Sequence, residues 1–223
     1  MSQSTPVGTR TVSPQRVIEA IRSWQTSGHK PLVVAIDGHG SSGKSTLAER
    51  VAAELDAALL HTDDFFRPSD PARPRDAGSS MDEYYDWPRL RSEALAPLRA
   101  GQTAEFRAFD EALDAFKPGT VTVAPAPLIL LEGVSAGAEA LADLVDHRIL
   151  VQTPEPQRLE RVRQRVAPEA WNDDWLQTEH TYFAERPTSA FDLVVSGAEA
   201  GPDHATGPDA EAGAPALAKQ VGR

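Results

Sequence analysis

The chain has 223 residues, 40% of them apolar, which suits the core of one α/β domain. It contains no cysteine, which excludes disulfides and cysteine-ligated zinc, and its formal net charge of −11 argues against sequence-independent nucleic-acid binding. No apolar run approaches the roughly 20 residues of a membrane span. The N-terminal stretch MSQSTPVGTRTVSPQR lacks the apolar segment of a secretory signal, so we expect a cytoplasmic protein.

Helical and extended patterns alternate along the first half of the chain. Short apolar runs before glycine or acidic residues are typical of buried parallel strands, and apolar residues three or four apart are typical of helices. The elements expected in order are a flexible segment 1–12, a helix from Ser13-Pro14, a strand over 31–37, a helix over 44–56, a strand over 57–62, a loop over 67–82 and a helix after Pro88.

The second half continues the alternation after short extended pieces over 103–124. The elements expected are strands over 127–132, 147–152 and 191–196, and helices over 135–144, after Thr153-Pro154 and over 172–185. Residues 198–223 are rich in Ala, Gly, Pro and Asp, so we expect a disordered tail after a folded domain over 13–197. Five strands alternating with helices predict an α/β fold, with a parallel sheet and helices on both faces.

A glycine-rich loop stands between the first strand and the second helix. Its sequence, GHGSSGKS from Gly38 to Ser45, matches G-x-x-x-x-G-K-[ST] in full. We expect Lys44 to reach the β- and γ-phosphates of ATP, and the hydroxyl of Ser45 to ligate Mg²⁺. The residues predicted to bind the nucleotide are Gly38, Gly40, Ser41, Ser42, Gly43, Lys44, Ser45 and Thr46.

Other motifs narrow the class of P-loop protein. The chain lacks the N-K-x-D of switch GTPases and the L-S-G-G-Q of transport ATPases, and its strand 127–132 ends in Leu-Glu-Gly rather than paired acids. The second strand ends at Asp63-Asp64, where a carboxylate can accept the proton of an acceptor hydroxyl. This combination favours phosphoryl transfer to an alcohol.

The ordered segments VVAIDGHGSSGKSTLAERVAAEL, HTDDFF, YYDWPRL and LILLEGV, followed by an arginine-bearing helix, resemble the uridine kinase family. They are also similar to nicotinamide riboside kinases and, more distantly, to phosphoribulokinase and pantothenate kinase. The resemblance covers residues 31–196. It implies a five-stranded parallel sheet with a small lid over the phosphates.

The resemblance assigns roles to three carboxylates. It implies that Asp63 is the catalytic base, with a strand-end cap or a group near Mg²⁺ as the alternative, and that Glu132 serves Mg²⁺. It places Asp86 on the two hydroxyls of a ribose, although Asp86 also stands where a helix N-cap would, and it places Tyr85 beside it in the substrate site.

Arginines on the helix after Pro154 complete the expected site. The resemblance implies that they neutralise the transferring phosphoryl group, with Arg161 as the first candidate and Arg158 and Arg165 as substrate-binding neighbours. A solvated surface balanced by Glu160 is the alternative. Asp114 occupies the position of the histidine that reads the base in uridine kinases, which weakens the case for a pyrimidine substrate.

The sequence therefore predicts a kinase that uses ATP and Mg²⁺ to phosphorylate the 5′-hydroxyl of a ribonucleoside. Alternatives are a kinase of nicotinamide riboside, a sugar or a pantothenate-like acid, and a P-loop module that regulates a partner without turnover. The expected partner is a small-molecule substrate, without nucleic acid or membrane, and a homo-oligomer remains open.

Overall fold

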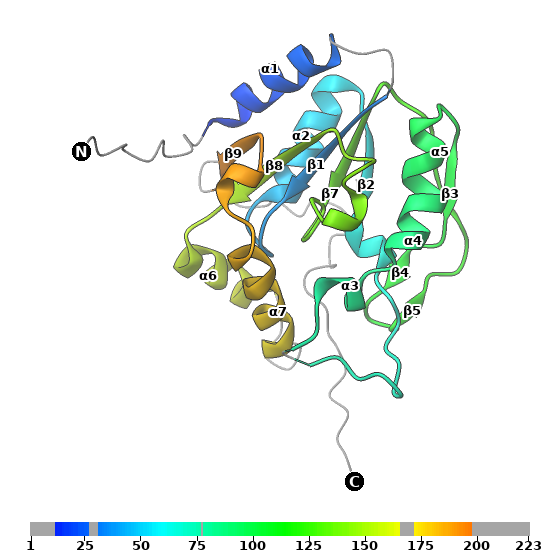
Figure 1. Cartoon of the computed structure of the whole chain (residues 1–223), viewed down its shortest axis with the longest axis vertical. Helices are drawn as coiled ribbons and strands as arrows, with labels where there is room; N and C mark the ends of the chain where they lie inside the picture. The colour runs from blue at the N-terminus through cyan, green and yellow to red at the C-terminus, as the bar shows by residue number, and fades with distance from the viewer. Residues whose placement is uncertain (1–11, 27–30, 77, 166–171, 198–223) are drawn as a thin grey trace, which may run out of the picture.

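A computed structural model describes residues 12–26, 31–76, 78–165 and 172–197. Within these residues a five-stranded parallel sheet with the order β2-β7-β1-β8-β9 forms the centre of the molecule (Figure 1). Its strands are β1 (Leu32–Asp37), β2 (Ala58–His61), β7 (Leu128–Glu132), β8 (His147–Gln152) and β9 (Leu193–Ser196). The α/β fold class expected from the sequence is confirmed.

The parallel register brings the carboxyl ends of the central strands to one edge. Glu132 of β7 lies opposite both Ile36 of β1 and His61 of β2. The chain segments that leave these three strands therefore start side by side, which is where open α/β sheets bind ligands.

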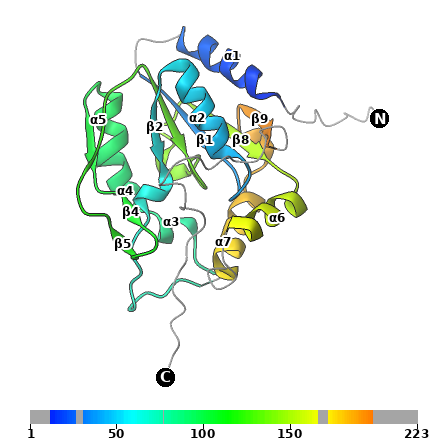
Figure 2. The same ribbon diagram turned by 180° about the vertical axis from the view of Figure 1, so that it is seen from behind.

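Two hydrophobic clusters cover the two faces of the sheet. Along β1, Val34 and Ile36 pack in one cluster, and Val33 and Ala35 pack in the other, as the alternation of a strand requires. Helices α1 (Pro14–Gln25) and α2 (Lys44–Leu55) supply the first cluster and lie in front of the sheet in Figure 2.

The second cluster is supplied by the chain between β2 and β7 and by helix α7. The chain between β2 and β7 contains η1 (Thr62–Phe65), α3 (Met81–Tyr84), α4 (Trp87–Arg89), η2 (Leu90–Leu95), α5 (Ala96–Arg99), β3 (Ala104–Phe106), β4 (Phe109–Asp110), β5 (Ala115–Phe116) and β6 (Val121–Val123). The remaining elements are η3 (Glu139–Leu141), α6 (Glu155–Arg165), α7 (Asp173–Ala184) and η5 (Thr188–Ala190).

The helix expected after Pro88 is present but contains a π-helical segment, Leu90–Leu95, where Ala96 N–H bonds to the carbonyl of Arg91. Pro97 lies inside the helix and has no N–H for the carbonyl of Glu93. A π-segment relieves this conflict because it widens the helix at the proline.

The helix expected over 135–144 is wrong. This stretch contains only the short 3₁₀ helix Glu139–Leu141, and Ser135 has a φ of 59°, in the left-handed region. The N–H of Gly137 donates to the carboxylate of Asp37 instead of to a helical carbonyl. A contact with a distant strand has therefore replaced a local helix.

The folded domain includes one residue more than expected at its start. Val12, which the sequence analysis placed in a flexible segment, forms a bridge with Val195 and donates its N–H to Val194. Residues 1–11 and the expected tail over 198–223 lie outside the described residues. None of the described helices has the length and apolar character that a membrane span needs.

Candidate active site

The P-loop wraps the start of α2 in a backbone shape that demands glycine. Gly43, the N-cap of α2, has a φ of 94°. At Gly38, where φ is 149°, an added Cβ would lie only 2.4 Å from the carbonyl oxygen of Val151. The glycines of the motif therefore serve this turn and the close packing of the loop against β8, as the motif requires.

Polar contacts hold the loop from inside and from behind. Lys44 is buried and donates from Nζ to the carbonyl of His39 at 2.9 Å. Thr153, at the end of β8, donates to the carbonyl of Ser42 at 2.8 Å. The Ser42 hydroxyl is buried and has no hydrogen-bond partner among the described residues. The loop thus presents donors to one side and is anchored on the other.

Ser45, Glu132 and His61 form a chain of contacts at the carboxyl edge of the sheet. The Ser45 hydroxyl donates to Glu132 Oε1 at 3.2 Å, and His61 Nδ1 lies 2.8 Å from Glu132 Oε2. Burial raises the pKa of Glu132, but the hydrogen bond from His61 and the charge of Lys44 outweigh burial and lower that pKa. Burial likewise lowers the pKa of His61, but Glu132 overrides it and raises that pKa to about 9.

The Ser45 and Glu132 oxygens fit a magnesium site. Mg²⁺ prefers a few hard oxygen ligands from the protein together with waters and phosphates, and an ionised carboxylate beside a P-loop hydroxyl supplies them. Among the described residues, no group of three or more acidic or histidine side chains is arranged to hold a metal by itself.

Asp63 projects from η1, next to the end of β2. Its side chain is exposed, but surrounding protein still desolvates the carboxylate, and this effect, followed by the charge of Glu132, raises the pKa of Asp63 to about 6. The neighbouring Asp64 is less exposed, and its backbone carbonyl accepts a hydrogen bond from Arg89 at 2.8 Å. An accessible carboxylate with a raised pKa suits a group that accepts a proton.

Asp86 takes the N-cap position that the sequence offered as an alternative to ribose binding. Its carboxylate accepts from the N–H of Arg89 at 3.2 Å and lies 3.8 Å from the guanidinium of Arg67. The side chain nevertheless remains 29% exposed, so the cap leaves part of it accessible. Tyr85 is fully buried and packs on Trp87, with ring centroids 4.5 Å apart.

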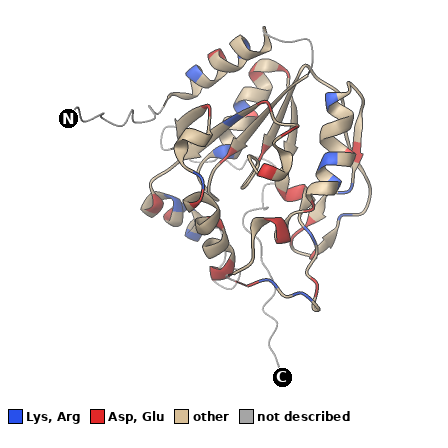
Figure 3. Cartoon of the chain, in the orientation of Figure 1, with Lys and Arg blue, Asp and Glu red and all other residues tan. Residues whose placement is uncertain are grey.

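Two arginines of α6, Arg158 and Arg161, face the protein, whereas Arg163 is exposed. Arg161 lies 3.4 Å from the carbonyls of Ser41 and Gly197, so in this structure it braces the back of the P-loop. Arg158 is buried and pairs with Glu179 of α7 at 3.2 Å. The side chain of Arg165 lies outside the described residues. Figure 3 shows basic positions along α6 and acidic positions in the first turn of α7.

Asp114 joins the turn between β4 and β5 to the loop that follows η1. It lies in the turn between β4 and β5 with a φ of 46°, and its carboxylate accepts from the N–H of Ser69 at 3.0 Å. The β4–β5 hairpin is thereby tied to the loop after η1. Asp114 therefore makes a structural contact at the position where the resemblance placed a base-reading histidine.

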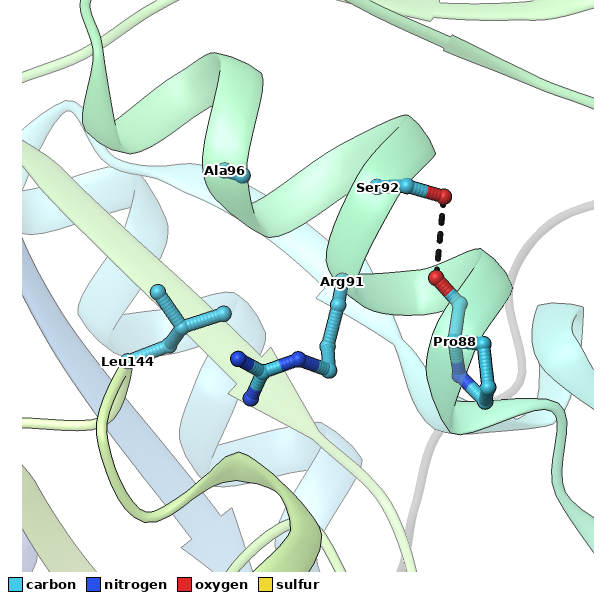
Figure 4. Close-up of a pocket in the computed structure, with 5 residues that line it drawn as sticks. All are labelled: Pro88, Arg91, Ser92, Ala96 and Leu144. Atoms are coloured by element: carbon cyan, nitrogen blue, oxygen red, sulfur yellow. Dashed lines mark hydrogen bonds between the residues drawn. The ribbon is translucent and has the colours of Figure 1, made fainter.

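A depression on the surface lies outside this site. It is lined by Pro88, Arg91, Ser92, Ala96 and Leu144 (Figure 4), none of which belongs to the P-loop or to the strand ends. The guanidinium of Arg91 is paired with both carboxylate oxygens of Asp143, at 2.6 and 2.7 Å.

A profile described as an AAA domain matches residues 33–183, more than half of the chain. The chain belongs to the AAA domain family. Uridine-cytidine kinase A of Dictyostelium discoideum is 29% identical over 140 residues, which are 59% of this chain but only 27% of that kinase. The uridine kinase of Halobacterium salinarum is 28% identical over 177 residues, 73% of this chain and 78% of that protein.

A solved structure supports the fold of this AAA domain protein. The structure described as a "possible uridine kinase" from Bacillus stearothermophilus superposes with a TM-score of 0.59 at 19% identity, over 81% of this chain and 98% of the other. At this identity the likeness concerns the fold alone. It agrees with the five-stranded parallel sheet and its P-loop.

Two residues of the AAA domain site were missed in the sequence. No motif assigns a role to His61, but it contacts Glu132. Glu179 lies within an expected helix and in no motif, but it is buried and accepts the N–H of Gly40 in the P-loop. Each contact joins residues far apart in the chain, so no local pattern marked either one.

Proposed function

We propose that this protein is an ATP-dependent small-molecule kinase of uridine kinase type, which phosphorylates the 5′-hydroxyl of a ribonucleoside. The observation that carries the proposal is the exposed carboxylate of Asp63 on the same sheet edge as a complete P-loop. The uridine kinases among the relatives and the AAA domain match support the same class. A protein that only binds ATP has no need of such a base.

We assign the residues of the site the following roles in the reaction. The P-loop N–H groups and Lys44 bind the phosphates of ATP and offset their charge. Asp63 accepts the proton of the acceptor hydroxyl. The oxygen of that hydroxyl then bonds to the γ-phosphorus, while the bond between the γ-phosphorus and the β-phosphate oxygen breaks and ADP leaves. Arg161 supports the reaction by fixing the Ser41 carbonyl, and hence the shape of the loop.

Ser45 and Glu132 would hold Mg²⁺, which neutralises phosphate charge when bound. His61 would keep Glu132 oriented through its second oxygen. We also propose that the protein is cytoplasmic and that its partner is a small-molecule substrate. The small lid over the phosphates stays a prediction.

A kinase of another small alcohol is the second candidate. Asp114 stands in place of a base-reading histidine and is bonded to the backbone of Ser69, which leaves the acceptor side without that contact to a pyrimidine. Nicotinamide riboside, a sugar and a pantothenate-like acid are the acceptors to compare.

The test is an acceptor screen with ATP and Mg²⁺ on four proteins: the wild type, Asp63→Asn, Asp64→Asn and Lys44→Ala. We expect wild-type transfer to a ribonucleoside well above background hydrolysis and no detectable transfer by a folded Lys44→Ala. Asp63→Asn should retain ATP binding but lose about 10²-fold or more in turnover, the scale of a general base. Asp64→Asn, the matched control, should lose much less.

The opposite order of effects for the two aspartates would show that the base has been assigned wrongly. Transfer to a diol-free alcohol but to no nucleoside would retain the kinase and overturn the acceptor class. Transfer to none of these alcohols by a protein that binds ATP would favour the regulatory module.

A further inference from the structure

Glu179 is a buried carboxylate at the mouth of the P-loop that the proposed reaction does not use. It lies in α7, its side chain is 1% exposed, and one of its oxygens accepts the backbone N–H of Gly40. The other oxygen lies 3.2 Å from the guanidinium of Arg158, which is itself 8% exposed. Both partners of this acid are therefore fixed inside the protein.

The partners of Glu179 are groups of the kind that bind phosphate. A P-loop N–H and an arginine are the usual donors to a nucleotide, and a carboxylate offers them the same charge as a phosphate oxygen. Lys44 is also directed at a protein acceptor, the carbonyl of His39. Three donors at the phosphate side of the loop are thus bonded to acceptors that belong to the protein.

Helix α7 is joined to the P-loop region at two further points. Tyr182 donates to Asp37 at the end of β1 at 2.9 Å, and Phe183 stacks on His39 with ring centroids 4.1 Å apart. Neither of these contacts uses a donor that a phosphate needs. Of these α7 residues, only Glu179 occupies donors for which an anionic ligand would compete.

We propose that Glu179 is a positioning residue that stands in for a phosphate group, holding the Gly40 N–H and Arg158 until ATP takes these donors from it. This inference rests on the proposed ATP binding by the P-loop and goes beyond it, because it couples α7 to the nucleotide. Burial raises the pKa of Glu179, and the bonds to Gly40 and Arg158 oppose that rise.

The proposal predicts competition between two anions. A carboxylate this close to the phosphate side repels the nucleotide, and repulsion grows with nucleotide charge. Removal of the negative charge should therefore strengthen binding of a triphosphate more than binding of a diphosphate. A merely structural acid would behave differently, because its loss would loosen the loop and weaken both nucleotides.

The experiment compares the wild type, Glu179→Gln and Tyr182→Phe. Glutamine keeps the size of the side chain and an acceptor for Gly40, whereas Tyr182→Phe removes a hydrogen bond between α7 and Asp37 without removing a charged side chain from α7. Isothermal titration calorimetry with ADP and with a non-hydrolysable ATP analogue, each with Mg²⁺, gives the Kd values. Thermal melting checks that each variant folds.

We expect Glu179→Gln to bind the ATP analogue about tenfold more tightly than the wild type, with a smaller gain for ADP. Tyr182→Phe should change both Kd values less, and by similar factors. Unchanged or weaker binding of the analogue to a folded Glu179→Gln would overturn the inference.

A crystal structure of the wild type with the ATP analogue decides the question even if Glu179→Gln does not fold. Glu179 should then no longer be within hydrogen-bond distance of the Gly40 nitrogen, and a retained bond would overturn the inference. Because these measurements need no acceptor, they are independent of the transfer assay. A wild type that binds neither nucleotide would overturn the P-loop assignment and this inference together.

Discussion

Asp86 has a structural role as an N-cap and a proposed role in ribose binding. Its carboxylate caps α4 through the N–H of Arg89, yet 29% of the side chain is exposed. The cap needs only a polar oxygen, which asparagine also has, whereas a ribose diol is best held by a carboxylate that accepts from both hydroxyls. The two roles can therefore be separated by choice of substitution.

We predict that Asp86→Asn keeps the melting temperature of the wild type but loses discrimination between ribonucleosides and 2′-deoxyribonucleosides. In the wild type the missing hydroxyl should lower kcat/KM by about 5- to 150-fold, the equivalent of about 1–3 kcal/mol. Asp86→Ala, the control, should lose the discrimination and also about 1 kcal/mol of stability through the cap. Equal discrimination in Asp86→Asn and the wild type would leave Asp86 as a cap alone.

Arg89 of α4 contacts both η1 and β5. Its guanidinium lies between the rings of Phe65 in η1 and Phe116 in β5, 4.7 and 4.6 Å from their centroids. It also donates to the carbonyls of Asp64 and Arg107, at 2.8 and 2.6 Å. A planar group with several donors can make all of these contacts at once, and an ammonium cannot.

We predict that Arg89→Lys lowers the free energy of unfolding by about 2–3 kcal/mol, because an ammonium cannot bond to both carbonyls and also pack on both rings. Urea unfolding measures this loss. Arg91→Lys is the matched control on the same helix. Its partner, Asp143, is solvent-exposed, so the loss should be smaller. A larger loss from Arg91→Lys would contradict this account of Arg89.

At the scale of the whole molecule, the packing of α7 against the P-loop makes stability depend on pH. His39 stacks on Phe183, and burial, followed by the charges of Arg158 and Lys44, lowers the pKa of His39 from 6.5 to about 3. In the unfolded chain the imidazole takes up a proton below about pH 6.5. The folded state does not, so His39 costs stability as the pH falls through that range.

We predict that the stability of the wild type relative to His39→Asn decreases by about 1 kcal/mol between pH 7.5 and 5.5. Urea unfolding at several pH values measures the free energy of unfolding of each protein. Comparing how this free energy changes with pH in the two proteins removes the constant loss of the stacking contact in His39→Asn. His180→Asn, an exposed change on α7, is the control. A wild-type advantage that grows as the pH falls would show that the imidazole is charged in the folded protein.

The sequence determined the features that have a local signal. Apolar runs that end in glycine or acid marked the strands, because a buried parallel strand needs apolar residues on both faces. The P-loop motif marked the nucleotide site, because its glycines are needed for the turn itself. These signals were enough to predict that Asp63 and Glu132 each stand at the end of a strand, and the structure shows that the two strands are neighbours.

Tertiary structure alone decided the partners of the polar groups. His61 meets Glu132 across 71 residues, Gly137 meets Asp37 across 100, and Gly40 meets Glu179 across 139. Periodicity reports which face of an element is buried, but the partner of a polar atom depends on which elements the fold brings together. For that reason the helix over 135–144 was predicted wrongly. The contact of Glu179 with the P-loop could not be predicted either, because it depends on how α7 packs against that loop.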